Sequence, residues 1–303
     1  MKTLYITDLD GTLLDSRIRV SETSADLLNR AIASGALVSV ATARTPATLS
    51  ILLRDVRLRL PMVVMTGAAL WHRNDNRYSD VCTFPPEKVE EIRATYSRYN
   101  LPTFIYTLRD NRLHIYHQGP LSDYERNFVS ERLHSPFKRF HLTDPVLAAV
   151  SHGENEIPAD SPVAIPDVID NALLFFGMQN AALDHPAYIA LRKIKDINAM
   201  IYPDANIPEI TMIEAFARHA TKAEGIRRLK RIAGADRVVV FGDNLNDLPM
   251  FDEADVAVAV ANALPEVRRR ADIVIGSHDV DSVAKFILDD YLSHTTDAPK
   301  LQF

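Results

Sequence analysis

The sequence predicts an α/β protein with a Rossmann-like parallel sheet core that is interrupted by an inserted α+β domain. Short apolar strands alternate with helical patterns at both ends of the chain, and this alternation is typical of parallel sheets with right-handed crossovers. In the middle, strands joined by turns replace the alternation and favour antiparallel pairing. The core is therefore predicted in two pieces, 1–83 and 217–303, around an insertion at 84–216.

Composition fits such a protein. The chain has 303 residues, enough for two domains, with 47% hydrophobic and 24% charged residues. The net charge of −6, without a long basic run, argues against a nucleic-acid partner. The single cysteine, Cys82, excludes an internal disulfide and a cysteine-based zinc site. Because there is no signal-peptide pattern and no membrane-length apolar run, we expect a cytoplasmic protein without a membrane partner; the oligomeric state stays open.

The first third is predicted to alternate strands and helices. Ser21 can cap a helix that ends at Gly35, and Thr45 with Pro46 can open another that runs to about Arg57. Three apolar segments are the predicted strands: the run that ends at Thr7, then 37–41 and 61–65.

The insertion begins at Phe84-Pro85-Pro86, which breaks the alternation of strands and helices. Its clearest sign is a hairpin whose strands, 103–107 and 113–117, are joined across Asp110 and Asn111. An irregular, proline-containing region follows the second helix of the insertion. The remaining predictions are helices from Val89 to Tyr99, over 123–133 and over 186–195, a strand over 173–178, and two last strands flanking 203–206.

The alternation resumes at Thr221. Lys222 starts a helix that ends near Gly234, and Asn262 with Pro265 can open a short one. The other predicted elements are strands over 238–241, 256–260 and 273–275 and a closing helix over 281–288.

Two carboxylates, Asp8 and Asp10, follow the first strand, and Gly11 can make a sharp left-handed turn after them. As residues two apart on a strand, both are expected on one face of the sheet edge where ligands bind. Carboxylates this close repel each other unless a cation or a proton lies between them, and oxygen ligands suit Mg²⁺. A polar turn after a buried strand is the alternative explanation.

A second acidic group follows the strand that ends at Phe241. Asp243 should emerge at the same sheet edge as Asp8, and a helix that starts near Asn246 would turn Asp247 back towards it. An acidic turn with a helix cap would look the same in isolation. Two acidic clusters on strand ends together favour a cation site.

These residues can supply the parts of a phosphoryl-transfer site. Asp8 can attack phosphorus, and Asp10 can protonate the leaving group and later deprotonate water. Thr42 follows the second strand and Lys222 opens a helix, so each falls where a phosphate contact is needed.

Asp8-Leu9-Asp10-Gly11-Thr12 resembles the signature of the haloacid dehalogenase-like hydrolase superfamily, and Thr42, Lys222 and the Asp243–Asp247 stretch match its other motifs in order. The insertion and the stretch 256–263 resemble the Cof-type phosphatases, which carry a C2-type cap. The resemblance implies that Asp8 is the nucleophile and Asp10 the acid/base. It further implies phosphate contacts from Thr42, Arg44, Lys222 and Asn246 (the last to phosphate or to Asp8), Mg²⁺ on Asp8, the Asp10 carbonyl and Asp243, and support of the metal by Asp247.

The chain departs from the family pattern at Ala43, Thr66 and Ser282, none of which is charged. We therefore expect a Mg²⁺-dependent phosphatase for a small phosphorylated metabolite such as a sugar phosphate. A phosphomutase, or a metabolite-binding protein without catalysis, is the alternative.

Other side chains have simpler interpretations. His114 and His117 are expected at the surface or at an interface rather than as metal ligands. The aromatic residues Trp71, Tyr78, Phe175 and Phe176 are expected to pack in a core.

Overall fold

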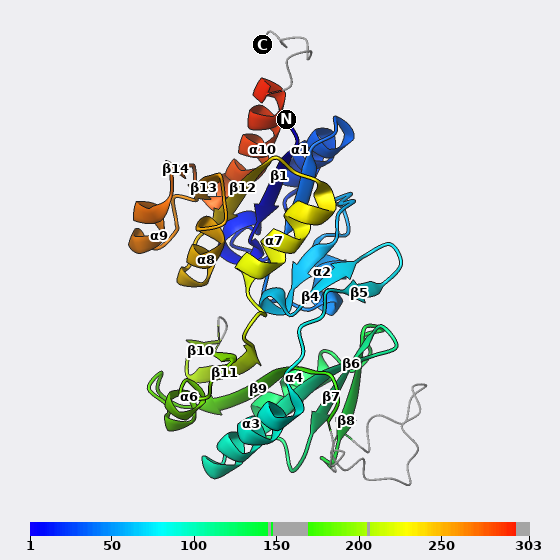
Figure 1. Cartoon of the computed structure of the whole chain (residues 1–303), viewed down its shortest axis with the longest axis vertical. Helices are drawn as coiled ribbons and strands as arrows, with labels where there is room; N and C mark the ends of the chain where they lie inside the picture. Colours follow the sequence, from blue (N-terminus) through cyan, green and yellow to red (C-terminus); the bar gives the residue numbers. More distant parts are fainter. Residues whose placement is uncertain (145–146, 148–168, 205–206, 295–303) are drawn as a thin grey trace. The chain divides into compact units, whose positions relative to one another are not determined.

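The computed structural model describes residues 1–144, 147, 169–204 and 207–294, and it divides into two compact units (Figure 1). The first, which we call the core unit, joins Met1–Asp80 with Ala220–Phe303. The second, Val81–His219, is the inserted unit. Each is described by itself below.

A five-stranded sheet in the order β14-β13-β12-β1-β2 forms the centre of the core unit. All of its pairings are parallel, which confirms the predicted core. β1, which lies between β12 and β2, is buried along its whole length, as expected for a strand covered on both faces. The strands are β1 (Thr3–Thr7), β2 (Leu37–Val40), β12 (Arg237–Gly242), β13 (Val256–Ala259) and β14 (Ile273–Val274).

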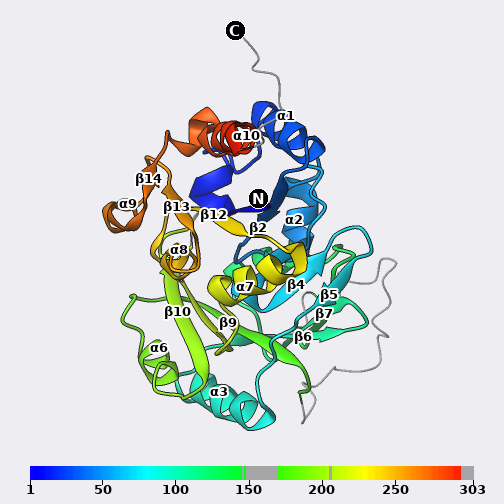
Figure 2. The ribbon, with the colours of Figure 1, turned by 45° about the horizontal axis from the view of Figure 1, so that its top comes forward.

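Helices cover both faces of this sheet: α1 and α10 pack together on one face and α7 lies on the other (Figure 2). Ser21 caps α1 as predicted, because its hydroxyl accepts a hydrogen bond from the Ser24 amide at 2.9 Å. Two helix predictions were only partly right. Thr45 and Pro46 begin their helix as predicted, but Thr45 makes no side-chain cap and the helix ends at Leu52 rather than near Arg57. Pro265 opens the short helix after β13 as predicted, but the residue that precedes it is Leu264 and not Asn262. The helices are α1 (Glu22–Ala33), α2 (Pro46–Leu52), α7 (Lys222–Ala233), α8 (Leu248–Phe251), α9 (Pro265–Arg270) and α10 (Ser282–His294).

The third predicted strand does not continue the parallel sheet. β3 (Met62–Val64) meets β2 only through a parallel bridge between Ala41 and Val63 and pairs instead with the antiparallel hairpin β4 (Ala69–His72) and β5 (Arg77–Ser79). The reason is the turn Met65–Gly67, whose residues all have positive φ and send the chain back along β3. Trp71 and Tyr78 pack in this hairpin with 1% and 7% exposure, so their predicted burial is confirmed.

A six-stranded sheet in the order β10-β11-β9-β6-β7-β8 forms the inserted unit. The predicted hairpin is confirmed: Asp110 and Asn111 have φ of 49° and 55°, as a tight two-residue turn requires. The sheet is mixed rather than purely antiparallel, because β8 runs parallel to β7 in a stretch predicted to be irregular. The strands are β6 (Thr103–Arg109), β7 (Arg112–His117), β8 (Lys138–Leu142), β9 (Ala172–Asn180), β10 (Ile197–Pro203) and β11 (Ile210–Ala217).

Helices lie on both faces of this second sheet. Phe175 stacks on Tyr96 of α3 (Pro86–Arg98), whereas its neighbour Phe176 faces Phe128 of α4 (Asp123–Ser130), with ring centroids 6.2 Å and 5.5 Å apart. Both phenylalanines are buried, as predicted. His117 was predicted wrongly as a surface residue: it is fully buried against Phe104 because its strand position faces α4. A third helix is α6 (Pro186–Leu191).

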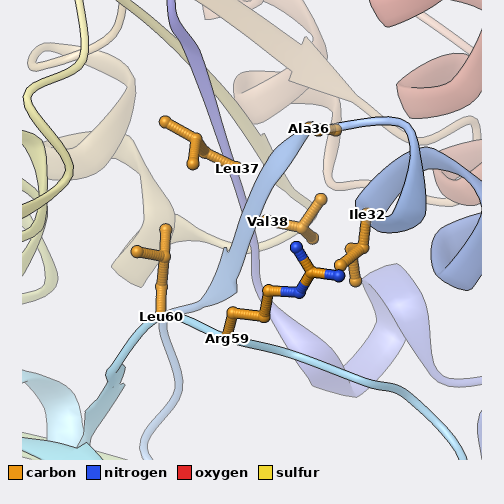
Figure 3. A pocket seen from close by; sticks show the side chains of 7 residues that line it. Ile32, Ala36, Leu37, Val38, Arg59 and Leu60 are labelled. Carbon is orange, nitrogen blue, oxygen red and sulfur yellow. The ribbon is translucent and has the colours of Figure 1, made fainter.

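Two further observations concern possible sites elsewhere in the molecule. No helix in the described part of the chain combines the length and the hydrophobicity needed to cross a bilayer. A small apolar pocket lined by Ile32, Val38 and Leu60, with the Arg59 guanidinium beside it, lies at the amino end of β2 (Figure 3). The predicted functional residues follow the opposite, carboxyl ends of the strands.

Candidate active site

The predicted site residues converge at the carboxyl edge of the core sheet. Asp8 follows β1, Asp243 follows β12 and Thr42 follows β2, and these three strands are hydrogen-bonded neighbours. Because parallel strands end at the same edge, residues from distant parts of the chain meet there.

Asp8 directly follows β1, whereas Asp10 lies within the turn η1 (Leu9–Leu13). β1 ends at Thr7, and Gly11 adopts a φ of 71° that bends the chain sharply, as predicted. Asp10 therefore does not lie on the strand, so strand periodicity does not determine where its side chain points. The Asp8 side chain is 9% exposed, whereas that of Asp10 is 52% exposed.

Lys222 lies between two buried carboxylates. As the first residue of α7 it sends its ammonium Nζ to within 2.9 Å of Asp8 Oδ1 and 2.7 Å of Asp247 Oδ1. Its side chain is only 1% exposed, so it is not an ordinary solvated lysine. The structure thus brings together three residues that the sequence predicted for the site.

Asp247 holds the second acidic loop in place. Its Oδ2 accepts hydrogen bonds from the amides of Asp243 and Asn244, at 2.9 and 3.1 Å, while Oδ1 accepts from Lys222. A Cβ on Gly242 would lie 2.6 Å from the Asp247 Cβ, so this approach requires glycine. Both Asp247 oxygens are already engaged, which fits a supporting role better than direct metal ligation.

Asp243 is tied to the first motif. The Thr12 hydroxyl donates to its Oδ1 at 2.8 Å. The backbone of Gly11 approaches the same carboxylate so closely that a Cβ there would lie 2.5 Å from Oδ2. Gly11 is therefore needed for its positive φ and also for this contact. The role of Thr12 was not identified from the sequence, because nothing in the motif says which distant oxygen its hydroxyl meets.

Burial and neighbouring charges shift the pKa values of Asp8, Asp243 and Lys222. Desolvation raises the pKa of Asp8, the Lys222 charge opposes the rise, and the nearby Asp247 adds to it. Desolvation also raises the pKa of Asp243 to about 6. For Lys222, burial acts against the charged form, but Asp247 and Asp8 outweigh it and raise its pKa. With two carboxylates within 2.9 Å, Lys222 stays charged.

The same cluster can hold a cation. Carboxylate oxygens of Asp8, Asp243 and Asp247 all lie within 4.8 Å of one another. Carboxylates this close together repel one another and are stabilised by a divalent ion, and an all-oxygen donor set suits Mg²⁺.

The Arg44 guanidinium is paired with Asp10, the acid/base candidate. Its Nε and Nη2 donate to the two Asp10 oxygens at 2.7 and 2.6 Å, a bidentate pair. Thr42 is 1% exposed, and its hydroxyl accepts the Arg44 amide at 3.1 Å. The pairing of Arg44 with Asp10 was not predicted, because 34 residues separate them.

Two further residues near the site have unpaired polar atoms. The Asn246 Oδ1 and the Thr66 Oγ1 are buried and have no hydrogen-bond partner within the described ranges. Asn246 makes no hydrogen bond to Asp8, one of the two contacts expected for it. Thr66 has a φ of 58°, and its amide donates to the carbonyl of Thr42 at 3.0 Å.

Comparison with known proteins places this site in a family. A model of the haloacid dehalogenase-like hydrolases matches residues 5–160 and 180–287. The 5-amino-6-(5-phospho-D-ribitylamino)uracil phosphatase YitU of Bacillus subtilis (strain 168) is 25% identical over 293 residues, which cover 96% of this chain and 97% of the relative.

Solved structures share the fold. A haloacid dehalogenase-like hydrolase from Bacteroides thetaiotaomicron superposes with a TM-score of 0.71 at 20% identity, over 96% of this chain and 100% of the other. The subclass IIB sugar phosphatase BT4131 gives a TM-score of 0.68 at 20% identity, over 96% and 99%. The chain therefore belongs to the haloacid dehalogenase-like hydrolase family and is one of its Cof-type phosphatases, a phosphoric monoester hydrolase with an inserted cap.

Proposed function

We propose that the protein hydrolyses a small phosphorylated metabolite in a Mg²⁺-dependent reaction, with Asp8 as the nucleophile. The observation that carries this proposal is the buried contact of Lys222 with both Asp8 and Asp247. It supplies a carboxylate nucleophile and a fixed positive charge at one point of the sheet edge, which is what phosphoryl transfer needs.

The reaction takes two steps. Asp8 attacks phosphorus, the bond from phosphorus to the ester oxygen breaks, and Asp10 gives its proton to that leaving oxygen. Asp10 then takes a proton from a water molecule that attacks the phosphorus of the aspartyl-phosphate, which releases phosphate and restores Asp8. General acid–base catalysis of this kind contributes roughly 10²–10⁴ in rate. The bidentate contact of Arg44 fixes the direction of the Asp10 carboxylate.

The phosphoryl oxygens need donors. We assign this role to Lys222, whose Nζ contacts Asp8, and to the Thr42 hydroxyl, which lies at the same edge of the sheet. Asn246 is the third candidate, because its buried side chain still has an unpaired polar atom.

Asp8, the Asp10 carbonyl and Asp243 are the proposed Mg²⁺ ligands. Asp243 fits because Thr12 engages only its Oδ1. Asp247 supports the site without ligating, since its two oxygens already accept three hydrogen bonds. When bound, Mg²⁺ supplies positive charge that lowers the repulsion between the nucleophile and the phosphoryl oxygens.

The substrate class is proposed from similarity. YitU acts on a phosphorylated ribityl compound and BT4131 is a sugar phosphatase, so we propose a phosphomonoester of a sugar or sugar alcohol. A phosphomutase would use the same aspartates but return the phosphate to its substrate.

A substrate panel tests the proposal. Purified protein with Mg²⁺ is given hexose phosphates, ribitol phosphate, pyridoxal phosphate and p-nitrophenyl phosphate, without any bisphosphate activator, and released phosphate is measured. We expect steady release from at least one sugar-type ester and none from the Asp8→Asn variant. Turnover that requires a bisphosphate would identify a mutase, and equal rates for the parent and Asp8→Asn would remove Asp8 from the mechanism.

A further inference from the structure

Side chains from the C-terminal part of the core unit hold the turn η1 that carries Asp10. Asn262, just after β13, donates from Nδ2 to the Gly11 carbonyl at 2.7 Å. The two residues are 251 positions apart in the sequence. We call Asn262, His278, Asp279 and Asp281 the C-terminal clasp.

The other clasp residues fix Asn262 and the chain that follows η1. The His278 amide donates to Asn262 Oδ1 at 3.0 Å, and His278 Nδ1 lies 2.7 Å from the Leu14 carbonyl, to which it donates. Asp279 accepts the Ser16 amide at 2.8 Å. Asp281 accepts hydrogen bonds from the hydroxyls of Ser21 and Ser24.

Asn262 binds η1 at Gly11, the residue of this turn that also lies against Asp243. Gly11 lies so close to the Asp243 carboxylate that a Cβ would lie 2.5 Å from its Oδ2, and the Gly11 carbonyl accepts the hydrogen bond from Asn262. The Gly11–Thr12 peptide, to which this carbonyl belongs, is thus fixed by the clasp, while Gly11 itself is confined by a metal-ligand candidate. Because Gly11 joins this peptide to Asp10, a rotation there would change where the Asp10 carbonyl and carboxylate point.

Burial among other side chains does not hold Asn262 against η1. It is an exposed residue, and both ends of its amide are used, one for η1 and the other for His278. A water molecule could replace a single exposed hydrogen bond, but it would not be anchored to a second segment of the chain in the same way.

We propose that Asn262 is a positioning residue that fixes the Gly11–Thr12 peptide and, through Gly11, the orientation of the Asp10 carbonyl and carboxylate for Mg²⁺ binding and acid/base catalysis. This inference rests on the proposed function. Groups that orient metal ligands from outside typically change affinity or activity by about 10- to 100-fold when they are removed.

The test uses the intact protein with Asn262→Asp, which keeps an acceptor for the His278 amide but replaces the donor to Gly11 with an oxygen. Asn262→Ala is the second variant. We expect kcat to fall about tenfold or more while KM stays within about twofold, because Thr42 and Lys222 are untouched. Calorimetric titration with Mg²⁺ alone, without substrate, should show weaker binding by a similar factor.

Arg268→Ala is the matched control. Arg268 is exposed and donates to the Ala261 carbonyl, next to Asn262, but has no contact with η1. It should leave kcat and Mg²⁺ affinity unchanged. The inference is overturned if both Asn262 variants keep the parental kcat and Mg²⁺ affinity, or if their losses only follow a loss of folded protein seen by circular dichroism. Failure of the proposed function would instead appear in the parent protein, as no turnover and no Mg²⁺ binding.

Discussion

Lys222 of the core unit and two ionisable residues of the inserted unit, Glu214 and His117, are all buried but have different surroundings. In the core unit the Lys222 ammonium contacts two carboxylates within 2.9 Å. In the inserted unit, Glu214 on β11 is 8% exposed and His117 on β7 is fully buried. Within the described ranges, the Glu214 Oε2 and both His117 ring nitrogens have no hydrogen-bond partner.

These surroundings favour different charge states for the buried groups of the two units. Burial raises the pKa of Glu214 to about 7 and lowers the pKa of His117 to about 4, so both shifts favour the uncharged form. In the core unit, pairing keeps Lys222 charged in spite of burial. We propose that the inserted unit contributes selection among leaving groups.

The largest expected effect comes from removing the cation. Chelation with EDTA should abolish phosphate release, and Mg²⁺ should restore it, because the carboxylates of the core unit cannot bind a phosphate ester while uncompensated. Asp243→Asn should lower kcat/KM at fixed Mg²⁺ by about 100-fold or more, since a direct ligand is lost. The exposed Asp26→Asn is the control and should behave as the parent. Full activity after complete chelation would show that the acidic cluster has another purpose.

A smaller loss is expected when Asp10 loses its partner. Arg44→Gln removes a bidentate contact and should reduce kcat by about 10- to 100-fold without loss of fold. Arg30→Gln, which breaks only the exposed 3.9 Å pair with Asp26, should stay within about twofold. Steady-state kinetics of both variants would settle the role of Arg44: equal values would make its contact with Asp10 irrelevant to turnover.

Deleting the inserted unit tests whether it determines the choice of substrate. A short Gly/Ser joint from Cys82 to Ala217 removes 83–216 but none of the predicted catalytic residues. Hydrolysis of p-nitrophenyl phosphate, whose leaving group needs little help, should stay within about tenfold of the parent, while the ranking of natural esters collapses. A cooperative thermal transition must first show that the core unit folds. Retention of the parental substrate ranking would place specificity in the core unit.

The smallest effect on activity is expected from Glu214→Gln, which should instead change stability. The Glu214 pKa is raised from an ordinary 4.5 to about 7 in the folded state, so the folded protein holds a proton that the unfolded chain releases between these values. Stability therefore falls as pH rises from about 4.5 to 7 and then levels off. The variant should be more stable than the parent by up to about 3 kcal/mol at pH 8 and by little at pH 4.5.

Urea unfolding at both pH values checks this prediction, with the exposed Glu90→Gln as control. An unfolding free energy for Glu214→Gln that differs from the parent equally at both pH values would show that ionisation of Glu214 does not matter. Activity on p-nitrophenyl phosphate should be unchanged in either variant.

The positions of Asp8 and Asp243 could be predicted from the sequence because each motif directly follows an apolar strand. Apolar strands lead directly into Asp8 and Asp243, and parallel pairing then brings them together. The course of the chain beyond the strand ends was not predictable in the same way. Strand periodicity put Asp10 beside Asp8, but β1 ends at Thr7 and the Asp10 carboxylate pairs with Arg44.

Tertiary pairing accounts for the other differences. The positive φ values of Met65 and Thr66 turn β3 into a hairpin, although neither residue type favours that conformation. β8 gains its strand conformation from parallel pairing with β7, which no local pattern announces. The clasp joins Asn262 to Gly11 through a contact between positions 251 residues apart. Such features depend on contacts that only the folded chain defines.

Detection of the covalent intermediate on Asp8 tests the central claim most directly. The Asp10→Asn variant is mixed with p-nitrophenyl phosphate and Mg²⁺, quenched in acid, digested with trypsin and analysed by mass spectrometry. Because the good leaving group needs no acid while release from the enzyme needs Asp10 as base, the intermediate should accumulate. We predict one added phosphoryl group on the peptide Thr3–Arg17, located at Asp8 and absent from an Asp8→Asn/Asp10→Asn protein. A phosphoryl group on another residue, or a burst of p-nitrophenol without label on this peptide, would contradict the account.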